Sequence, residues 1–270
     1  MALLSQSRRA LVGGLLLSSI GLTGARARET RWPGGARAAV SLTYDDGLDS
    51  QLDNVIPALE ARGLKGTFFL VRDNVDERIG DWVKAAALGH EIGNHTVSHQ
   101  CTLGAFTEAV FAEREILPME AYLDLHFGPR RLRTFAYPCG FLGLGRGDMR
   151  RRFGRYRLAL EDTFAAARTV AGEPNDPATA VRDRLTLRAF EPTYDVDSVV
   201  TAARYLKAAL ARGAWAMLVF HEVLPQRVGE GDTSIAVHDR IVDLAQDDRL
   251  WCAPMGEVFT HLSRDRAESA

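Results

Sequence analysis

Short apolar runs that read as buried β-strands alternate with longer amphipathic segments from residue 38 to the end of the chain. The runs contain β-branched, aromatic and small residues and stop at turn residues, as strands do. The segments between them read as helices, several of which end at a glycine such as Gly63, Gly89 or Gly213. This alternation predicts an α/β domain with a mostly parallel sheet and helical crossovers, either open or closed into a barrel.

The predicted elements cover most of residues 38–270 as one domain, with no internal repeat. The expected strands are Ala38–Tyr44, Gly66–Val71, Glu91–Asn94, Arg133–Tyr137, Ala214–Phe220 and Leu250–Ala253, with weaker candidates at Arg157–Leu160, Ala165–Ala171 and Leu185–Phe190. The expected helices are Leu52–Glu60, Asp76–Leu88, Phe106–His126 with a kink at Pro118, Asp195–Arg212, Ser234–Gln246 and Met255–Leu262.

The first 27 residues have the features of an export signal. A basic start at Arg8 and Arg9 precedes an apolar core from Leu11 to Leu22, and Ala25-Arg26-Ala27 fits a cleavage site. The pattern resembles a bacterial twin-arginine signal, and the following residues 28–37 read as a linker. The alternative is an uncleaved membrane anchor, although the apolar core is shorter than the ~20 residues that span a bilayer. We therefore expect an exported protein, periplasmic or secreted, with no membrane contact after cleavage.

The composition is that of an ordinary globular protein, with 46% hydrophobic residues and a formal net charge of −2. The balanced charge and the absence of a nucleic-acid-binding signature argue against a nucleic-acid partner. The cysteines are Cys101, Cys139 and Cys252, an odd number with no CxxC spacing. One disulfide could form after export, with its pairing open, and a cysteine-bound structural zinc is not expected.

Polar side chains follow several of the predicted strands. Asp45 and Asp46 end the first strand before Gly47, so that one carboxylate could bind a cation while the other handles a proton. His95 and His99 are four residues apart and would face the same way on a helical turn. Two histidines and one carboxylate suit a catalytic zinc site with open coordination positions, or an iron site for oxygen chemistry.

Two further candidates follow later strands. His221 ends the apolar strand Ala214–Phe220, and a histidine can transfer protons near neutral pH. Pro138-Cys139-Gly140 is a turn whose backbone N–H groups could face a developing oxyanion. The alternatives are a hydrogen-bonded structural histidine and a plain turn at the end of a strand.

Taken in order, these motifs resemble those of the polysaccharide deacetylases, carbohydrate esterase family 4. The resemblance spans roughly residues 38–222 and is carried by four segments: Thr43-Tyr44-Asp45-Asp46-Gly47, His95-Thr96-Val97-Ser98-His99, Phe135-Ala136-Tyr137-Pro138-Cys139-Gly140 and Leu218-Val219-Phe220-His221. It implies a distorted (β/α) barrel of seven strands, one divalent metal ion, most often Zn²⁺, and hydrolysis of N-acetyl or sometimes O-acetyl groups on a carbohydrate.

The resemblance also implies a role for each site residue. Asp45 would be the general base, and Asp46, His95 and His99 would be the metal ligands. His221 would be the general acid that protonates the departing amine. The N–H of Cys139 would complete the oxyanion site.

The third motif departs from the usual family pattern. Many members carry an arginine that orients the base two residues before the proline, where this chain has Ala136. Arg133 is offset from Ala136 by an odd number of residues and would face the other side of a regular strand. We therefore expect Arg188 to take this role from a later strand; the alternative is a solvated surface arginine.

The substrate would be an acetylated poly- or oligosaccharide, such as peptidoglycan or chitin oligomers. Two other functions remain open: a non-catalytic carbohydrate-binding barrel, and a 2-His-1-carboxylate iron oxygenase. The oxygenase would usually require an all-β scaffold, which the strand–helix alternation disfavours. The oligomeric state, the acetylated glycan and the choice between N- and O-deacetylation cannot be read from the sequence.

Overall fold

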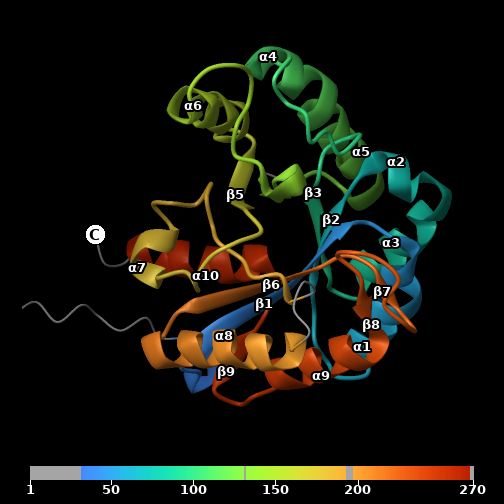
Figure 1. Cartoon of the computed structure of the whole chain (residues 1–270), viewed down its shortest axis with the longest axis vertical. Helices are drawn as coiled ribbons and strands as arrows, with labels where there is room; N and C mark the ends of the chain where they lie inside the picture. The colour runs from blue at the N-terminus through green and yellow to red at the C-terminus, as the bar shows by residue number, and fades with distance from the viewer. Residues whose placement is uncertain (1–31, 131, 193–196, 268–270) are drawn as a thin grey trace, which may run out of the picture.

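A curled parallel sheet forms the centre of the computed structural model, which describes residues 32–130, 132–192 and 197–267. The proposed export signal lies outside the described residues. The strands lie in the order β5-β4-β3-β2-β1-β6, and β9 also pairs with β1, which makes a seven-stranded sheet. All of its strand pairs are parallel. This confirms the predicted α/β architecture, a (β/α) barrel that is curled but incomplete (Figure 1).

The predicted strands of the sheet are confirmed to within a few residues. They are β1 (Ala38–Asp46), β2 (Thr67–Leu70), β3 (Glu91–Asn94), β4 (Arg133–Ala136), β5 (Phe164–Arg168), β6 (Trp215–Phe220) and β9 (Leu250–Cys252). A separate small pair joins β7 (Val223–Leu224) to β8 (Thr233–Ser234).

The segment from Leu187 to Phe190 bridges the gap between β5 and β6. Leu187 pairs with Arg168 at the end of β5, and Phe190 pairs with Leu218 of β6, each through an isolated parallel bridge. The prediction of a strand over residues 185–190 is therefore correct in position, although only single bridges form. These two bridges join the two edges of the sheet and close the curl.

Helices cover the outside of the sheet, with α8 and α9 on one side and α4, α5 and α6 over the other end (Figure 1). The helices are α1 (Ile56–Glu60), α2 (Arg72–Val75), α3 (Ile79–Ala87), α4 (Glu108–Phe111), α5 (Leu117–Phe127), α6 (Met149–Leu160), α7 (Pro177–Ala180), α8 (Ser198–Arg212), α9 (Ile235–Ala245) and α10 (Met255–Ala267). Two π-helical turns, Gln51–Val55 and Ala112–Ile116, precede α1 and α5, and the second lies just before Pro118, where a kink was expected.

The prediction of a strand over residues 157–160 is wrong, because these residues form the last turn of α6. Asp148 caps the start of this helix by accepting a hydrogen bond from the N–H of Arg151 at 3.0 Å. Tyr156 and Leu160, four residues apart, are its buried side chains. The weaker strand candidate at residues 157–160 is therefore the end of this helix.

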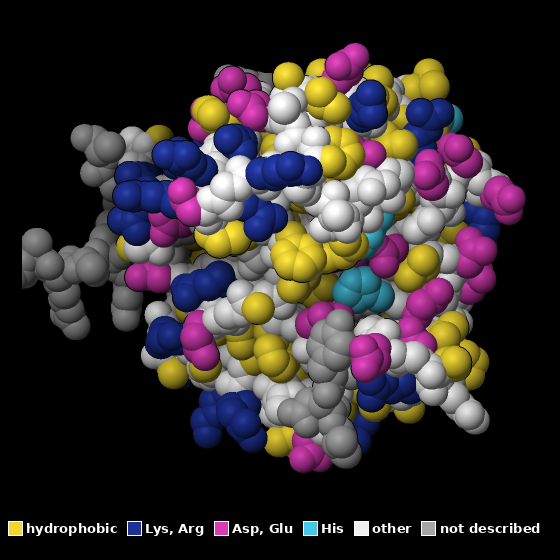
Figure 2. Space-filling view, turned by 45° about the horizontal axis from the view of Figure 1, so that its top comes forward, with side chains coloured by type: hydrophobic (Ala, Val, Ile, Leu, Met, Phe, Trp, Pro, Cys, Tyr) yellow, Lys and Arg dark blue, Asp and Glu magenta, His cyan; other side chains and the backbone are white. Residues whose placement is uncertain are grey.

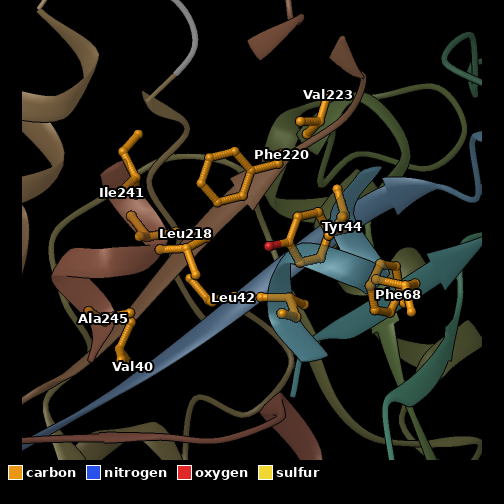
Figure 3. Close-up of a cluster of buried hydrophobic side chains, with 14 of the residues drawn as sticks. Val40, Leu42, Tyr44, Phe68, Leu218, Phe220, Val223, Ile241 and Ala245 are labelled. Atoms are coloured by element: carbon orange, nitrogen blue, oxygen red, sulfur yellow. The ribbon is translucent and has the colours of Figure 1, made fainter. Parts of the chain in front are cut away.

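Strand β1 separates two parts of the core by its alternation. Val40, Leu42 and Tyr44 face outward into the core beneath the helices, whereas Ala39 faces the interior of the curl. Figure 3 shows part of the outer core, in which side chains of β1 and β6 face α9: Val40, Leu42, Tyr44, Leu218, Phe220, Ile241 and Ala245. The same alternation points Asp45 into the curl at the carboxyl end of β1.

The described part of the predicted linker packs against the domain. Trp32 is 3% exposed, and its indole N–H donates to the backbone oxygen of Gly213 at 3.1 Å. The domain therefore begins before residue 38, the expected boundary. No helix within residues 32–130, 132–192 and 197–267 combines the length and apolarity that a membrane span needs.

Candidate functional site

The carboxyl ends of three strands bring the predicted polar residues together. Asp45 and Asp46 end β1, His95 follows β3, and His221 follows β6. In parallel α/β folds this end of the sheet is where ligands bind. Figure 2 shows histidine side chains at the surface near the middle of one face, next to acidic and apolar side chains.

Asp46, His95 and His99 form a compact cluster of metal-ligand type. Asp46 Oδ1 lies 3.5 Å from Nε2 of His95 and 3.5 Å from Nε2 of His99. One ligand atom from each residue lies within 4.8 Å of the other two. His95 Nδ1 is 2.9 Å from the carbonyl oxygen of Ala136, and a carbonyl can only accept, so Nδ1 carries the proton and Nε2 presents its lone pair.

These atoms fit a cation. Asp46 Oδ1 and His95 Nε2 are buried and have no hydrogen-bond partner among the described residues, although they face each other. A neutral imidazole lone pair and a carboxylate oxygen are both acceptors, and a cation between them would satisfy both. The carbonyl that fixes the His95 tautomer is the kind of outer partner that metal-binding histidines use.

The electrostatics favour the forms that bind metals. Burial raises the pKa of Asp46, but His95, His221 and His99 outweigh this effect and lower the pKa to about 2. Burial, followed by the neighbouring His95, lowers the pKa of His99. An ionised carboxylate and a neutral imidazole are the states that metal ligation requires.

The backbone of the site is strained. Within the described part of the chain, the non-glycine residues with positive φ are Asp46 (76°), Thr96 (72°), His99 (51°) and Cys139 (55°), and all four belong to the motifs above. Such conformations cost on the order of 1–3 kcal/mol each and persist where surrounding structure enforces them. The turn at Asp46 explains how two adjacent aspartates reach the same site although strand residues alternate sides.

The loop that carries His95 and His99 is not the helical turn that was considered from the spacing. Asn94 Oδ1 accepts a hydrogen bond from the N–H of Thr96 at 2.7 Å, and Thr96 Oγ1 accepts one from the N–H of His99 at 3.1 Å. These bonds stabilise the positive φ angles at Thr96 and His99. The imidazoles therefore meet through a tight loop, with ring centroids 4.8 Å apart.

Arg168, rather than Arg188, pairs with Asp45. The Arg168 guanidinium is fully buried, donates a hydrogen bond to Asp45 Oδ1 and lies over the ring of Phe69 at 4.8 Å. In the register of β4 and β5, Arg168 is the partner of Ala136. An arginine from the neighbouring strand thus occupies the place that the family usually fills from the position of Ala136.

The prediction that Arg188 orients Asp45 is wrong, because side chains alternate along this segment and Arg188 is on the outer side. Leu187 and Ala189 are buried in the interior core, so Arg188 between them points outward and is exposed. Its side chain lies against Gly172. The expected strand Ala165–Ala171 places Arg168 in mid-strand, whereas the structure ends the strand at Arg168, so the sequence carries no strand-end signal for this residue.

His221 lies across Asp45 from the metal-type cluster. Its Nε2 is 4.0 Å from Asp45 Oδ2, and its Nδ1 is 2.9 Å from Glu191 Oε1. Burial lowers the pKa of His221, but the hydrogen bond to Glu191 and the charges of Asp45, Glu191 and Asp46 outweigh burial and raise the pKa to about 9. Glu191 was not predicted as a site residue, although it directly follows the weaker strand candidate Leu185–Phe190.

Cys139 forms a disulfide with Cys101, and Cys252 is free. Cys101 is two residues beyond His99, so the disulfide ties the metal-type loop to the third-motif turn. Cys101 Sγ also lies 3.8 Å from His99 Nδ1, but the bond between the two sulfurs leaves the Asp46 cluster as the metal candidate. The role of the Cys139 N–H toward an oxyanion stays a prediction.

Sequence comparison finds relatives over parts of the chain. A family model described as polysaccharide deacetylase matches residues 23–145. A peptidoglycan-N-acetylglucosamine deacetylase from Bacillus cereus is 39% identical over 64 residues, 23% of each chain. A gellan lyase from Bacillus sp is 30% identical over 150 residues, 56% of this chain and 5% of that protein. The chain thus spans only a minor part of the length of these two relatives.

Structural comparison finds the same fold in several solved proteins. A Mycobacterium smegmatis protein assigned to the polysaccharide deacetylases has a TM-score of 0.64 at 18% identity, covering 89% of this chain and 95% of that one. An allantoinase has a TM-score of 0.63 at 16% identity, with the same coverages of 89% and 95%. A pseudoenzyme of carbohydrate esterase family 4 from Bacillus anthracis has a TM-score of 0.51 at 16% identity, covering 82% and 65%.

Because the sequence identities to these structures are low, the structural similarity shows the fold alone, and one fold can host several activities. The family match and the Bacillus cereus relative add sequence evidence that is independent of the fold. The chain is thus similar to the polysaccharide deacetylases in the sequence of residues 23–145, and it shares their fold.

Proposed function

We propose that this protein is a metal-dependent hydrolase that removes acetyl groups from a carbohydrate. The observation that carries the proposal is the position of Asp45, which is held by buried Arg168 and lies between the Asp46 cluster and His221. This arrangement provides one carboxylate for proton transfer, one set of metal ligands and one protonated imidazole within a few ångströms.

The residues divide the reaction between them. A divalent cation such as Zn²⁺, held by Asp46, His95 and His99, would supply Lewis-acid chemistry at the acetyl group. Asp45 is acceptor-only when ionised and takes the proton of the attacking water. His221, protonated up to about pH 9, donates a proton to the departing amine or alcohol. Cys139 offers its backbone N–H to the oxyanion.

Two rival functions make different demands on the site. A non-catalytic carbohydrate-binding barrel would not need Asp45, Arg168, His221 and Glu191 in one hydrogen-bonded and ion-paired series, yet all four are present. An iron oxygenase would share the Asp46 cluster, but its usual scaffold is all-β, and this sheet is parallel with helical crossovers. Acetate release from acetylated sugars by metal-loaded protein separates the hydrolase from both rivals.

We further propose that the protein acts outside the cytoplasm, from the paired Arg8 and Arg9 and the apolar core that follows them. The mature chain should then begin near Arg28. Sequencing the N-terminus of periplasmic material checks this, and replacing Arg8 and Arg9 by lysine should impair export. An intact Met1 on exported, membrane-held protein would contradict cleavage.

The two adjacent aspartates should separate metal binding from turnover. Asp45→Asn should keep about one divalent ion per chain but lose about 10²–10⁴-fold in turnover, because the general base is gone. Asp46→Asn should lose metal as well, because its carboxylate is a ligand. Elemental analysis beside acetate release distinguishes the two variants. If Asp45→Asn loses the metal and Asp46→Asn keeps it, the roles of base and ligand are reversed. Full activity of Asp45→Asn would refute the mechanism.

Arg168 should act as a positioning residue for Asp45. Arg168→Met should lower turnover about 10²-fold, with little change in KM, because a misplaced base costs rate rather than substrate affinity. Arg168→Lys keeps the charge and should recover part of the turnover. Arg188→Met, at the exposed arginine, is the matched control and should behave like the wild type.

Because Arg168 is buried, unfolding temperatures should accompany these measurements. If Arg188→Met impairs turnover and Arg168→Met does not, the assignment of Arg168 is wrong.

Glu191 should set the alkaline limit of activity. His221 is active as an acid when protonated, so the rate should fall as pH rises through its pKa of about 9. Glu191→Gln removes a carboxylate that raises this pKa, and the alkaline limb should move to lower pH by about one to two units. A bound cation would lower the pKa of His221 in the wild type, but Glu191→Gln would still lower this pKa further. A pH–rate profile measures it, and an unmoved alkaline limb would exclude this role for Glu191.

A further inference from the structure

A strongly basic segment follows the third-motif turn. Residues 141–160 contain six arginines and one aspartate, a formal charge of +5, on a chain whose total formal charge is −2. This segment, called here the basic arm, consists of the loop after Cys139 and helix α6. Figure 2 shows Lys and Arg side chains gathered on the same face as the histidines. The catalytic proposal does not use any of these arginines.

Four of the arginines are exposed; Arg157 pairs with Glu161 at 3.3 Å, and the other three are considered for a ligand. These three are Arg146, Arg150 and Arg151. Within residues 32–130, 132–192 and 197–267, no ion pair forms at the guanidinium of Arg146 or Arg150, and Arg151 has one pairing, with Asp148 at 3.6 Å. Like charges so close together repel one another, and a polyanion that binds them relieves this repulsion.

Two other arginines hold the arm in shape. Arg152 donates to the carbonyl oxygen of Gly143 at 3.3 Å, and Arg155 donates to that of Arg146 at 2.7 Å. The arm is therefore a fixed loop and helix.

A groove runs beside the basic arm. It has a volume of about 620 Å³ and is lined by residues 104–109 together with Arg146 and Arg155. Glu108, in the first turn of α4, is the one acidic residue in its lining. The groove could therefore accommodate an extended polymer whose negative charges face the arginines of the arm.

The two chain segments that lead to the groove lining both begin at residues of the candidate site. One segment continues from His99 through Cys101, and the other continues from Cys139, so the disulfide joins them at the site. Further along, the N–H of Gly145 donates to the carbonyl oxygen of Leu103 at 2.9 Å. Gly104 is five residues from His99, a separation of at most about 18 Å between their Cα atoms. Phe141, 54% exposed, lies just beyond Cys139 and offers an aromatic surface to a sugar ring.

We propose that the basic arm binds the distal part of the substrate and selects an acetylated glycan with repeated carboxylates. This inference rests on the proposed function, because it requires a substrate that reaches from the candidate site along the two connected chain segments to the groove. An anionic polymer would place one acetyl group at Asp45 while neighbouring carboxylates contact Arg146, Arg150 and Arg151. A flat membrane surface would contact the exposed arginines and leave the groove empty. Because Arg146 and Arg155 of the arm also line the groove, we favour an extended glycan as the ligand.

A matched set of glycans tests the inference. The probes are peptide-free peptidoglycan strands with free lactyl carboxylates, the same strands with those carboxylates amidated, and neutral chitin oligomers. Wild-type protein should show a KM about tenfold lower for the charged strands than for the amidated strands. The difference should shrink as the salt rises from 0.1 to 1 M, because the Debye length falls from about 10 Å to about 3 Å.

The triple variant Arg146→Gln, Arg150→Gln, Arg151→Gln should abolish this preference, with the KM for charged strands rising to that for amidated strands. The triple variant Arg204→Gln, Arg240→Gln, Arg264→Gln removes the same charge from exposed positions on α8, α9 and α10 and should keep the preference. Equal KM values for charged and amidated strands in the wild type would overturn the inference while acetate release upholds the proposed function.

Binding of end-labelled strands, measured by fluorescence anisotropy, keeps the inference testable without turnover. If no glycan is deacetylated but the first triple variant alone loses affinity for charged strands, the proposed function fails and the binding surface stands. Loss of affinity for phosphatidylglycerol vesicles, with unchanged affinity for the strands, would instead identify a membrane surface and overturn the inference.

Discussion

The buried ion pair between Asp45 and Arg168 is the contact on which the site depends. Both side chains are almost fully buried, Asp45 at 1% and Arg168 at 0% exposure. Burying two charges costs several kcal/mol per ion before their attraction and hydrogen bonds offset it, so such a pair adds little net stability. Its value is geometric, because an unpaired buried carboxylate would take up a proton or move toward water.

The parallel sheet makes this pair possible. Asp45 ends β1 and Arg168 ends β5, strands from opposite parts of the sheet, and the curl brings their interior faces together. At the other end of the sheet, Glu91 accepts hydrogen bonds from Thr67, Thr134 and the N–H of Gly256, which ties β2, β3, β4 and α10 together. One end of the sheet thus fixes the strands, and the other presents the reactive side chains.

Much of this arrangement could be predicted from the sequence because it follows from local pattern. The strands could be found from apolar runs, and Asp45, Asp46, His95, His99 and His221 from their positions at strand ends. Arg168 and Glu191 could not be found in this way, because their roles depend on register between β4 and β5 and on the bridge between β5 and β6. Arg188 was chosen from the sequence and is excluded by alternation, since Leu187 and Ala189 take the interior positions.

The four strained residues and the disulfide together fix the loops around the candidate site. Asp46, Thr96, His99 and Cys139 hold positive φ angles that an isolated chain would leave, so the surrounding structure must enforce them. Backbone hydrogen bonds accepted by the side chains of Asn94 and Thr96 help to enforce two of them, and the Cys101–Cys139 disulfide connects the loop of His99 to the turn of Cys139. A disulfide persists in oxidising compartments, so a site built on this one supports the proposal of export. The same disulfide connects the two chain segments that lead to the groove, so the position of the basic arm relative to the reactive carboxylate depends on it.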